Sequence, residues 1–171
     1  MAFIQTTENH RVSTSSEKQP LTRDEWERVI GINLRGVWSS MKYELRHMQS
    51  QGSGAIVNNA SVGALGGNPG IGSYIASKHG VIGLTRTAAL EYIKHGIRVN
   101  AVNPGLIDTQ IGHDVFKGDE QVYGQAAKSV PIGRAGTPEE IAAAVLWLCS
   151  SAASYVVGQA LTVDGGMTAG H

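Results

Sequence analysis

Three side chains suited to acid–base chemistry lie close together in the sequence: Ser61, Tyr74 and Lys78. Tyr74 and Lys78 are four residues apart, and in a helix that spacing puts both on one face with Cβ atoms about 5–6 Å apart. A free tyrosine has a pKa of about 10, and a neighbouring ammonium group lowers it by favouring the phenolate. We therefore expect Tyr74 to act as an acid–base group beside Lys78, with the Ser61 hydroxyl holding a substrate oxygen.

The residues around this group predict alternating strands and helices. Thr22 and Glu25 form a capping box, which indicates the start of a helix. Helices are expected at 22–50, 73–95 and 138–150, and strands at 55–60, 97–102 and 159–163. Residues 106–130 are expected to be irregular apart from a short helix at 121–128, and residues 1–20 to form a loose arm.

This alternation predicts an α/β fold built on a parallel sheet. Ligands of such sheets bind at the carboxyl ends of the strands. Ser61 ends one predicted strand, an Asn-Pro-Gly turn at 103–105 ends the next, and Tyr74 opens the helix between them. We therefore expect these residues to meet at one edge of the sheet. The glycine-rich loop between Ser61 and Tyr74 has neither of the usual phosphate-binding spacings, so it is interpreted as a flexible connection.

Asn33 lies in the apolar stripe of the first predicted helix, between Ile30 and Val37. An unsatisfied buried amide costs about 1–3 kcal/mol, so this side chain needs a partner. Either it bonds to its own backbone and bends the helix, or it reaches another buried polar group.

The composition excludes several classes of function. The 171 residues carry 14 basic and 14 acidic side chains, so no charge excess indicates a nucleic-acid or membrane partner. Cys149 is the single cysteine and has apolar neighbours, which favours an inert core thiol over a disulfide. No apolar run is long enough to cross a membrane, and the N-terminus lacks the pattern of a signal peptide. The sequence therefore predicts a cytoplasmic protein. Within the 106–130 loop, His113 is expected to be a solvated histidine.

Several motifs together carry a family resemblance. In chain order they are Asn33 in INLRGV, Ser61 in IVNNAS, Tyr74-Ile-Ala-Ser-Lys78, Asn103-Pro-Gly-Leu-Ile-Asp-Thr109 and Gly158-Gln-Ala-Leu-Thr-Val-Asp-Gly-Gly166. Their order and spacing resemble the short-chain dehydrogenase/reductase family over nearly all of residues 21–171. The resemblance implies a Rossmann-type parallel sheet with flanking helices, here the C-terminal, catalytic part of a doubly wound fold.

The resemblance also implies roles for individual residues. Tyr74 would be the general acid–base, and Lys78 would lower its pKa and hold the nicotinamide ribose. Ser61 would bind the substrate oxygen, and Asn33 would keep a water in a proton relay leading to Lys78. The reaction implied is the interconversion of a secondary alcohol and a ketone by hydride transfer.

The cofactor implied is NAD or NADP. By resemblance Pro104 and Gly105 would line the nicotinamide pocket. The backbone of Ile107 and the hydroxyl of Thr109 would meet the carboxamide or the pyrophosphate. No metal site is expected.

The family's N-terminal glycine-rich strand and turn have no counterpart in this sequence. The chain is therefore expected to be a fragment or truncated isoform that binds NAD(P) weakly. The strand at 55–60 should then be an open edge of a three-strand sheet, and stability should be reduced. Homo-oligomers are expected to form through the helices at 22–50 and 73–95.

Two other functions are open. The chain could be a non-catalytic relative that associates with full-length subunits. It could also be a hydrolase that uses Ser61 with Lys78 or Tyr74, although Ser61 is not in the G-x-S-x-G elbow of such enzymes.

Overall fold

The computed structural model describes residues 2–4 and 22–170. Its sheet has four parallel strands in the order β1-β2-β3-β4. The strands are β1 (Ala2–Ile4), β2 (Gly54–Asn59), β3 (Ile97–Pro104) and β4 (Ala160–Val163). The helices are α1 (Arg23–Val29), α2 (Gly36–Gln51), α3 (Gly72–Tyr92), α4 (Gln110–Val115), α5 (Glu120–Ser129) and α6 (Pro138–Cys149). The parallel α/β fold and the three strands predicted after residue 50 are confirmed.

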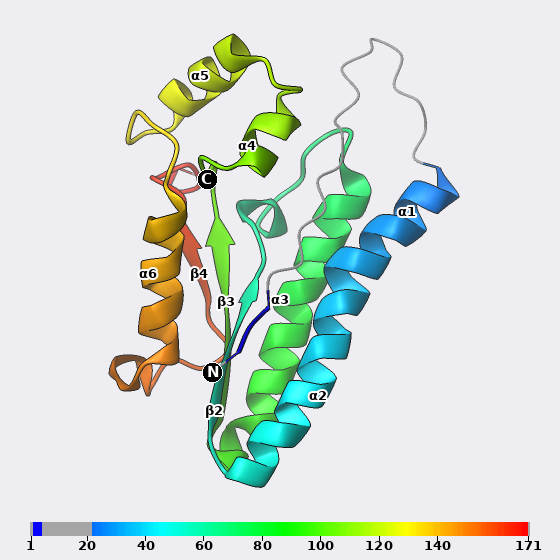
Figure 1. The fold of residues 1–171 in the computed structure, drawn as a ribbon, viewed down its shortest axis with the longest axis vertical. Helices are drawn as coiled ribbons and strands as arrows, with labels where there is room; N and C mark the ends of the chain where they lie inside the picture. Colours follow the sequence, from blue (N-terminus) through cyan, green and yellow to red (C-terminus); the bar gives the residue numbers. More distant parts are fainter. Residues whose placement is uncertain (1, 5–21, 171) are drawn as a thin grey trace.

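Helices cover both faces of the sheet, with α2 and α3 on one side and α6 on the other (Figure 1). Alternate residues of a strand point to opposite faces, and β2 follows this rule: Ile56 packs into the cluster with α2 and α3, and Val57 into the cluster with α6. Both side chains are fully buried. Both faces of the sheet are therefore covered by helices along β2.

The edge of β2 differs from the expectation. Ala2–Ile4 pairs in parallel with Ile56–Asn58, so the expected sheet of three strands with an open edge is wrong along this stretch. The apolar residues of β1 satisfy backbone groups of β2 that a solvent-exposed edge would leave unpaired. Of the predicted loose arm, residues 2–4 form this strand, and residues 1 and 5–20 lie outside the described residues.

The segment between β3 and α6 also differs from the expectation. It holds two helices: α5 is the short helix predicted at 121–128, and α4 stands where an irregular loop was predicted. Each helix has a side-chain N-cap: Thr109 accepts a hydrogen bond from the Gly112 N–H, and Asp119 accepts from Gln121 and Val122. Both helices lie beyond the carboxyl ends of the strands (Figure 1).

Thr22 and Thr137 start α1 and α6 with complete capping boxes, as the Thr22 and Glu25 pattern predicts. In the part of the chain that the structure describes, no helix has the length and apolar character needed to cross a membrane.

Candidate active site

A cavity of about 610 Å³ opens at the carboxyl ends of β2 and β3. Seven of the eight predicted site residues line it: Ser61, Tyr74, Lys78, Pro104, Gly105, Ile107 and Thr109. Asn33, the eighth, is fully buried and is not part of the cavity wall. The tertiary structure therefore brings together residues that are up to 48 positions apart, from Ser61 to Thr109, as expected for the edge of a parallel sheet.

The Ser61 hydroxyl is held where β2 ends. Its backbone is extended and it caps the short helical turn Val62–Ala64, with Oγ accepting a hydrogen bond from the Gly63 N–H at 3.1 Å. A hydroxyl that accepts this bond keeps its own proton available to donate. Ser61 lies beside Tyr74, because a Cβ built on Gly63 would be 3.4 Å from both Ser61 Oγ and Tyr74 Cε1.

Lys78 is almost completely buried, with 1% of its surface exposed. Its Nζ donates a hydrogen bond to the backbone carbonyl of Asn59 at 3.0 Å. The same nitrogen lies over the face of the Tyr74 ring, 5.7 Å from the ring centroid. The spacing of four residues in α3 therefore puts the two side chains together, with the ammonium over the ring.

The pKa values of this pair are governed by burial. Burial raises the pKa of Tyr74, and the nearby Ser61 hydroxyl lowers it by a smaller amount. Burial also lowers the pKa of Lys78 from 10.5 to about 8. Removing both groups from water favours their neutral forms. The lowering of the Tyr74 pKa by Lys78 stays a prediction.

Asn33 supports α3 from behind. It lies in a π-helical turn, Ile30–Arg35, that joins α1 to α2. Its Nδ2 donates to the Ser77 hydroxyl at 3.3 Å, and that hydroxyl donates to the backbone carbonyl of Tyr74 at 2.7 Å. The two alternatives for Asn33 are thus both partly realised, because the helix departs from α geometry here and the amide reaches a buried partner. Single π turns inside α-helices are frequent at functional sites.

Glycine is required where β3 ends. A Cβ on Gly105 would lie 2.8 Å from the Cα of Asp164, closer than real Cβ contacts. The Gly105 N–H donates to the carbonyl of Val163 at 3.1 Å, so the turn is pinned against the end of β4. Pro104 and Gly105 both line the cavity.

The outer wall comes from the residues that follow. Ile107 forms a bridge with Gly136, and Thr109 caps α4. Ile111 and Val115 of α4 add apolar side chains to the cavity. His113, on the same helix, does not line the cavity and is not a solvated histidine as expected, because it contacts Asp108 and Glu120.

Two contributors were not predicted from the sequence: Asn59 and Ser77. Asn59 supplies the carbonyl that holds Lys78, and Ser77 links Asn33 to α3. The signal available for Ser77 was its position one residue before Lys78, which puts a hydroxyl on the buried side of α3.

A family model described as Enoyl-(Acyl carrier protein) reductase, of the short-chain type, matches residues 9–168. The chain belongs to the short-chain dehydrogenase/reductase family.

Characterised members of the short-chain dehydrogenase/reductase family are similar over most of this chain. Cyclohexanol dehydrogenase of Acinetobacter sp. (strain SE19) is 47% identical over 150 residues, which cover 88% of this chain and 57% of the relative. Cis-4-hydroxycyclohexanecarboxylate dehydrogenase of Sinomonas cyclohexanicum is 50% identical over 144 residues, covering 84% of this chain and 57% of the relative.

Solved structures of the family agree with the fold. The crystal structure of levodione reductase superposes with a TM-score of 0.84 at 40% identity, covering 88% of this chain and 60% of the other. Gluconate 5-dehydrogenase from Burkholderia cenocepacia J2315, in complex with NADP and tartrate, superposes with a TM-score of 0.81 at 33% identity. The match covers 86% of this chain and 58% of the other. The chain thus spans less than two thirds of the length of these relatives.

The cavity fits the nicotinamide part of the cofactor that such relatives bind. Its volume of about 610 Å³ falls within the usual range for small-ligand sites, about 300–1,000 Å³. Asn59 lines it and has a buried Oδ1 without a hydrogen-bond partner in the described structure, and such an atom normally finds one.

Proposed function

We propose that this chain carries the catalytic centre of an NAD(P)-dependent oxidoreductase that interconverts a secondary alcohol and a ketone. The observation that carries the proposal is the convergence of Ser61, Tyr74 and Lys78 on one cavity, with the Lys78 ammonium over the Tyr74 ring. The names of relatives such as cyclohexanol dehydrogenase and levodione reductase support the same reaction class.

The proton step belongs to Tyr74. In alcohol oxidation, the carbon–hydrogen bond breaks with its electron pair leaving as hydride to the cofactor, and the hydroxyl proton passes to Tyr74 in its phenolate form. In ketone reduction, the phenol returns that proton to the carbonyl oxygen. A bound nicotinamide ring supplies the hydride chemistry. Because burial raises the pKa of Tyr74, the phenol is the resting form at neutral pH, which favours reduction.

Ser61 and Lys78 orient this step. Ser61 would donate its hydroxyl proton to the substrate oxygen, and the bond from the Gly63 N–H holds its Oγ in place. Lys78 remains largely charged at pH 7, since its pKa is about 8, and its position over the Tyr74 ring would stabilise the developing phenolate. Asn33 acts indirectly, because it fixes the α3 backbone through Ser77. We also assign to Asn33 the water of the proton relay that leads to Lys78.

The cofactor would be held at the end of β3. Pro104 and Gly105 would pack on the nicotinamide ring, and the Ile107 backbone and Thr109 hydroxyl would bind its carboxamide or the pyrophosphate. All four line the cavity next to Tyr74 and Lys78. The unsatisfied Asn59 Oδ1 offers one more acceptor.

The substrate is a neutral, apolar alcohol or ketone. Tyr74 and Lys78 are the two ionisable side chains among the described residues that line the cavity, and both have other roles. The wall from α4 presents Ile111 and Val115. A carboxylate or a sugar acid would find no further cation there, so cyclohexanol is a better probe than gluconate.

The test is turnover of cyclohexanol, or reduction of cyclohexanone, followed by nicotinamide absorbance with NAD and with NADP. We expect Tyr74→Phe to lower kcat by a factor on the order of 10²–10⁴, the usual contribution of a general acid–base. Calorimetry should show that cofactor affinity changes little, since phenylalanine fills the same space. Turnover that survives in Tyr74→Phe would refute the assignment of the acid–base.

The homo-oligomer and the alternative of a non-catalytic chain that joins full-length subunits would both use the surface of the two long helices. The long helices expose aromatic and aliphatic side chains, with Trp38 50%, Tyr43 65% and Leu90 76% accessible. We infer that α2 and α3 form the interface of a homo-oligomer. Light scattering should give a mass above that of one chain, and Trp38→Ser should shift it towards the monomer. A chain that associates but never turns over cyclohexanol would favour the non-catalytic alternative.

A further inference from the structure

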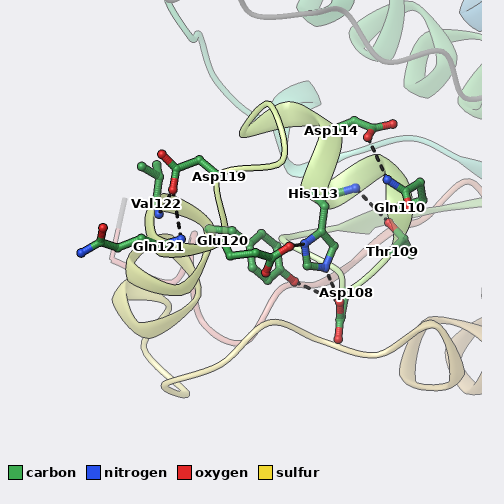
Figure 2. Close-up of polar contacts among 11 residues, drawn as sticks. Asp108, Thr109, Gln110, His113, Asp114, Asp119, Glu120, Gln121 and Val122 are labelled. Carbon is green, nitrogen blue, oxygen red and sulfur yellow. Dashed lines mark hydrogen bonds and ion pairs between the residues drawn. The ribbon is translucent and has the colours of Figure 1, made fainter.

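A polar cluster outside the cavity joins α4 and α5 to the residues that follow β3. His113 of α4 lies between two carboxylates (Figure 2). Its Nε2 is 2.8 Å from Asp108 Oδ1, and its Nδ1 is 3.1 Å from Glu120 Oε1. The three side chains come from three separate places: the strand exit, α4 and the first turn of α5.

The geometry specifies the protonation state of the imidazole. An ionised carboxylate only accepts hydrogen bonds, and a neutral imidazole donates from one ring nitrogen alone. Both ring nitrogens of His113 are within hydrogen-bond distance of a carboxylate oxygen. Both contacts are therefore favourable together only when the ring is protonated. Loss of the proton turns one of them into a repulsion between two lone pairs.

Ring stacking fixes the position of the imidazole. His113 stacks on Tyr123 of α5 with ring centroids 4.0 Å apart and planes 24° apart. Phe116 packs edge-on against the same tyrosine at 5.8 Å. The Tyr123 hydroxyl donates to Asp108 Oδ1 at 3.4 Å, so this carboxylate is shared by the histidine and the tyrosine. The imidazole is therefore held by contacts on several sides, and 25% of its side chain is exposed.

The cluster acts on the cavity through α4. Ile111 and Val115 line the cavity from the same six-residue helix that carries His113. A helix this short has little stability of its own. Its position therefore depends on contacts at its ends and side, which are the Thr109 cap and the contacts of His113.

We propose that His113 is a proton-dependent clamp that holds α4 and α5 together over the outer wall of the cavity. Protonated His113 bridges Asp108 and Glu120 and keeps Ile111 and Val115 in place. When His113 loses its proton, one bridge opens and the α4–α5 segment, residues 110–129, loosens. The proposal concerns the cavity wall and stands whether or not the chain turns over an alcohol.

The surrounding charges are consistent with this proposal. The hydrogen bond with Asp108 and the charge of Glu120 raise the pKa of His113 above its usual value, against a smaller opposing effect of burial. On its own helix Asp114 accepts a bond from Gln110, and in the α4–α5 connection Lys117 and Asp119 are exposed. A raised pKa in the folded chain means that the stabilisation is complete below about pH 6.5 and is lost as the pH rises through the higher folded value.

The test is hydrogen exchange of the full chain, measured by mass spectrometry from about pH 5.5 to about pH 8.5, a range that spans histidine titration. Exchange in residues 110–129 is expressed relative to intrinsic rates and to α2. We expect protection of this segment to fall roughly two- to fivefold as the pH rises, the factor that exposed ion pairs are worth. His113→Gln should show the low protection at every pH, because glutamine donates from a single nitrogen.

Two variants serve as matched controls. His47→Gln removes an exposed histidine on α2, and Asp114→Asn removes a charge from α4 that does not contact His113. Both should keep the pH dependence of the wild type. The clamp would be overturned by equal protection of 110–129 in wild type and His113→Gln across the range. It would also be overturned by a pH dependence that persists in His113→Gln.

Discussion

Lys78→Met isolates the energetic consequence of burying the candidate catalytic lysine. The Lys78 side chain is 1% exposed, and burial lowers its pKa from 10.5 to about 8. One pKa unit between folded and unfolded chain corresponds to about 1.4 kcal/mol, so the charged form is disfavoured in the fold by about 3 kcal/mol. Methionine keeps a similar length without the charge.

The direction of the pH effect follows from which state loses its proton first. Below about pH 8 the lysine is charged in both the folded and the unfolded chain, so the penalty is constant. Above that pH the folded chain loses the proton while the unfolded chain keeps it, and the wild type gains stability relative to the variant. From pH 7 to about pH 9.5 the gain should be about 2 kcal/mol. Tyr74 stays protonated over this range, because burial raises its pKa above 10.

The assay is urea unfolding of wild type and Lys78→Met at matched pH values, with linear extrapolation to water. Subtracting the two free energies removes the titration of groups that both proteins share. Lys94→Met, which removes an exposed lysine, controls for the loss of a positive charge. A difference between wild type and Lys78→Met that stays flat across the range would refute the reasoning, because it would mean that Lys78 keeps its proton in the fold.

Three further substitutions test other parts of the structure. Asn33→Ala removes the bond to Ser77, and the free energy of unfolding in urea should fall by about 1–3 kcal/mol; an unchanged value would exclude a structural role for the amide. Gly105→Ala puts a Cβ 2.8 Å from the Asp164 backbone, and this overpacking should cost about 1–3 kcal/mol. Calorimetry should therefore show a lower Tm, and a wild-type Tm would contradict the close approach. Thr137→Ala removes the cap of α6 and should destabilise by about 1 kcal/mol in urea, while Thr137→Ser should behave like the wild type.

Much of the fold could be predicted because its signals are local. The capping box at Thr22 and Glu25 depends on residues three apart, and the helix begins there. The strand at 55–60 begins with the apolar residues Ala55–Val57, and it pairs with the predicted strand at 97–102. The convergence of Ser61, Tyr74 and the turn at 103–105 followed from the rule that parallel strands present their carboxyl ends at one edge, and Ile107 and Thr109 came from the family resemblance.

The parts that were mispredicted depend on tertiary contacts. Helix α4 has six residues, too few to show an apolar period, and it is held by the contacts of His113 with Asp108 and Tyr123. Helix α5, by contrast, matches the short helix predicted at 121–128. The pairing of Ala2–Ile4 with β2 joins residues that are more than 50 positions apart, so it leaves no pattern within a window of ten or fifteen residues.

The sequence by itself determined which groups are available and in what order: a serine at the end of a strand, and a tyrosine and a lysine one helical turn apart. The tertiary structure alone decided how those groups behave. It buries Lys78 against the Asn59 carbonyl, raises the pKa of Tyr74, and connects Asn33 to α3 through Ser77. The physical reason is that desolvation is a sum over everything packed around a group, and those neighbours come from β2, α3 and the π-helical turn before α2 at once.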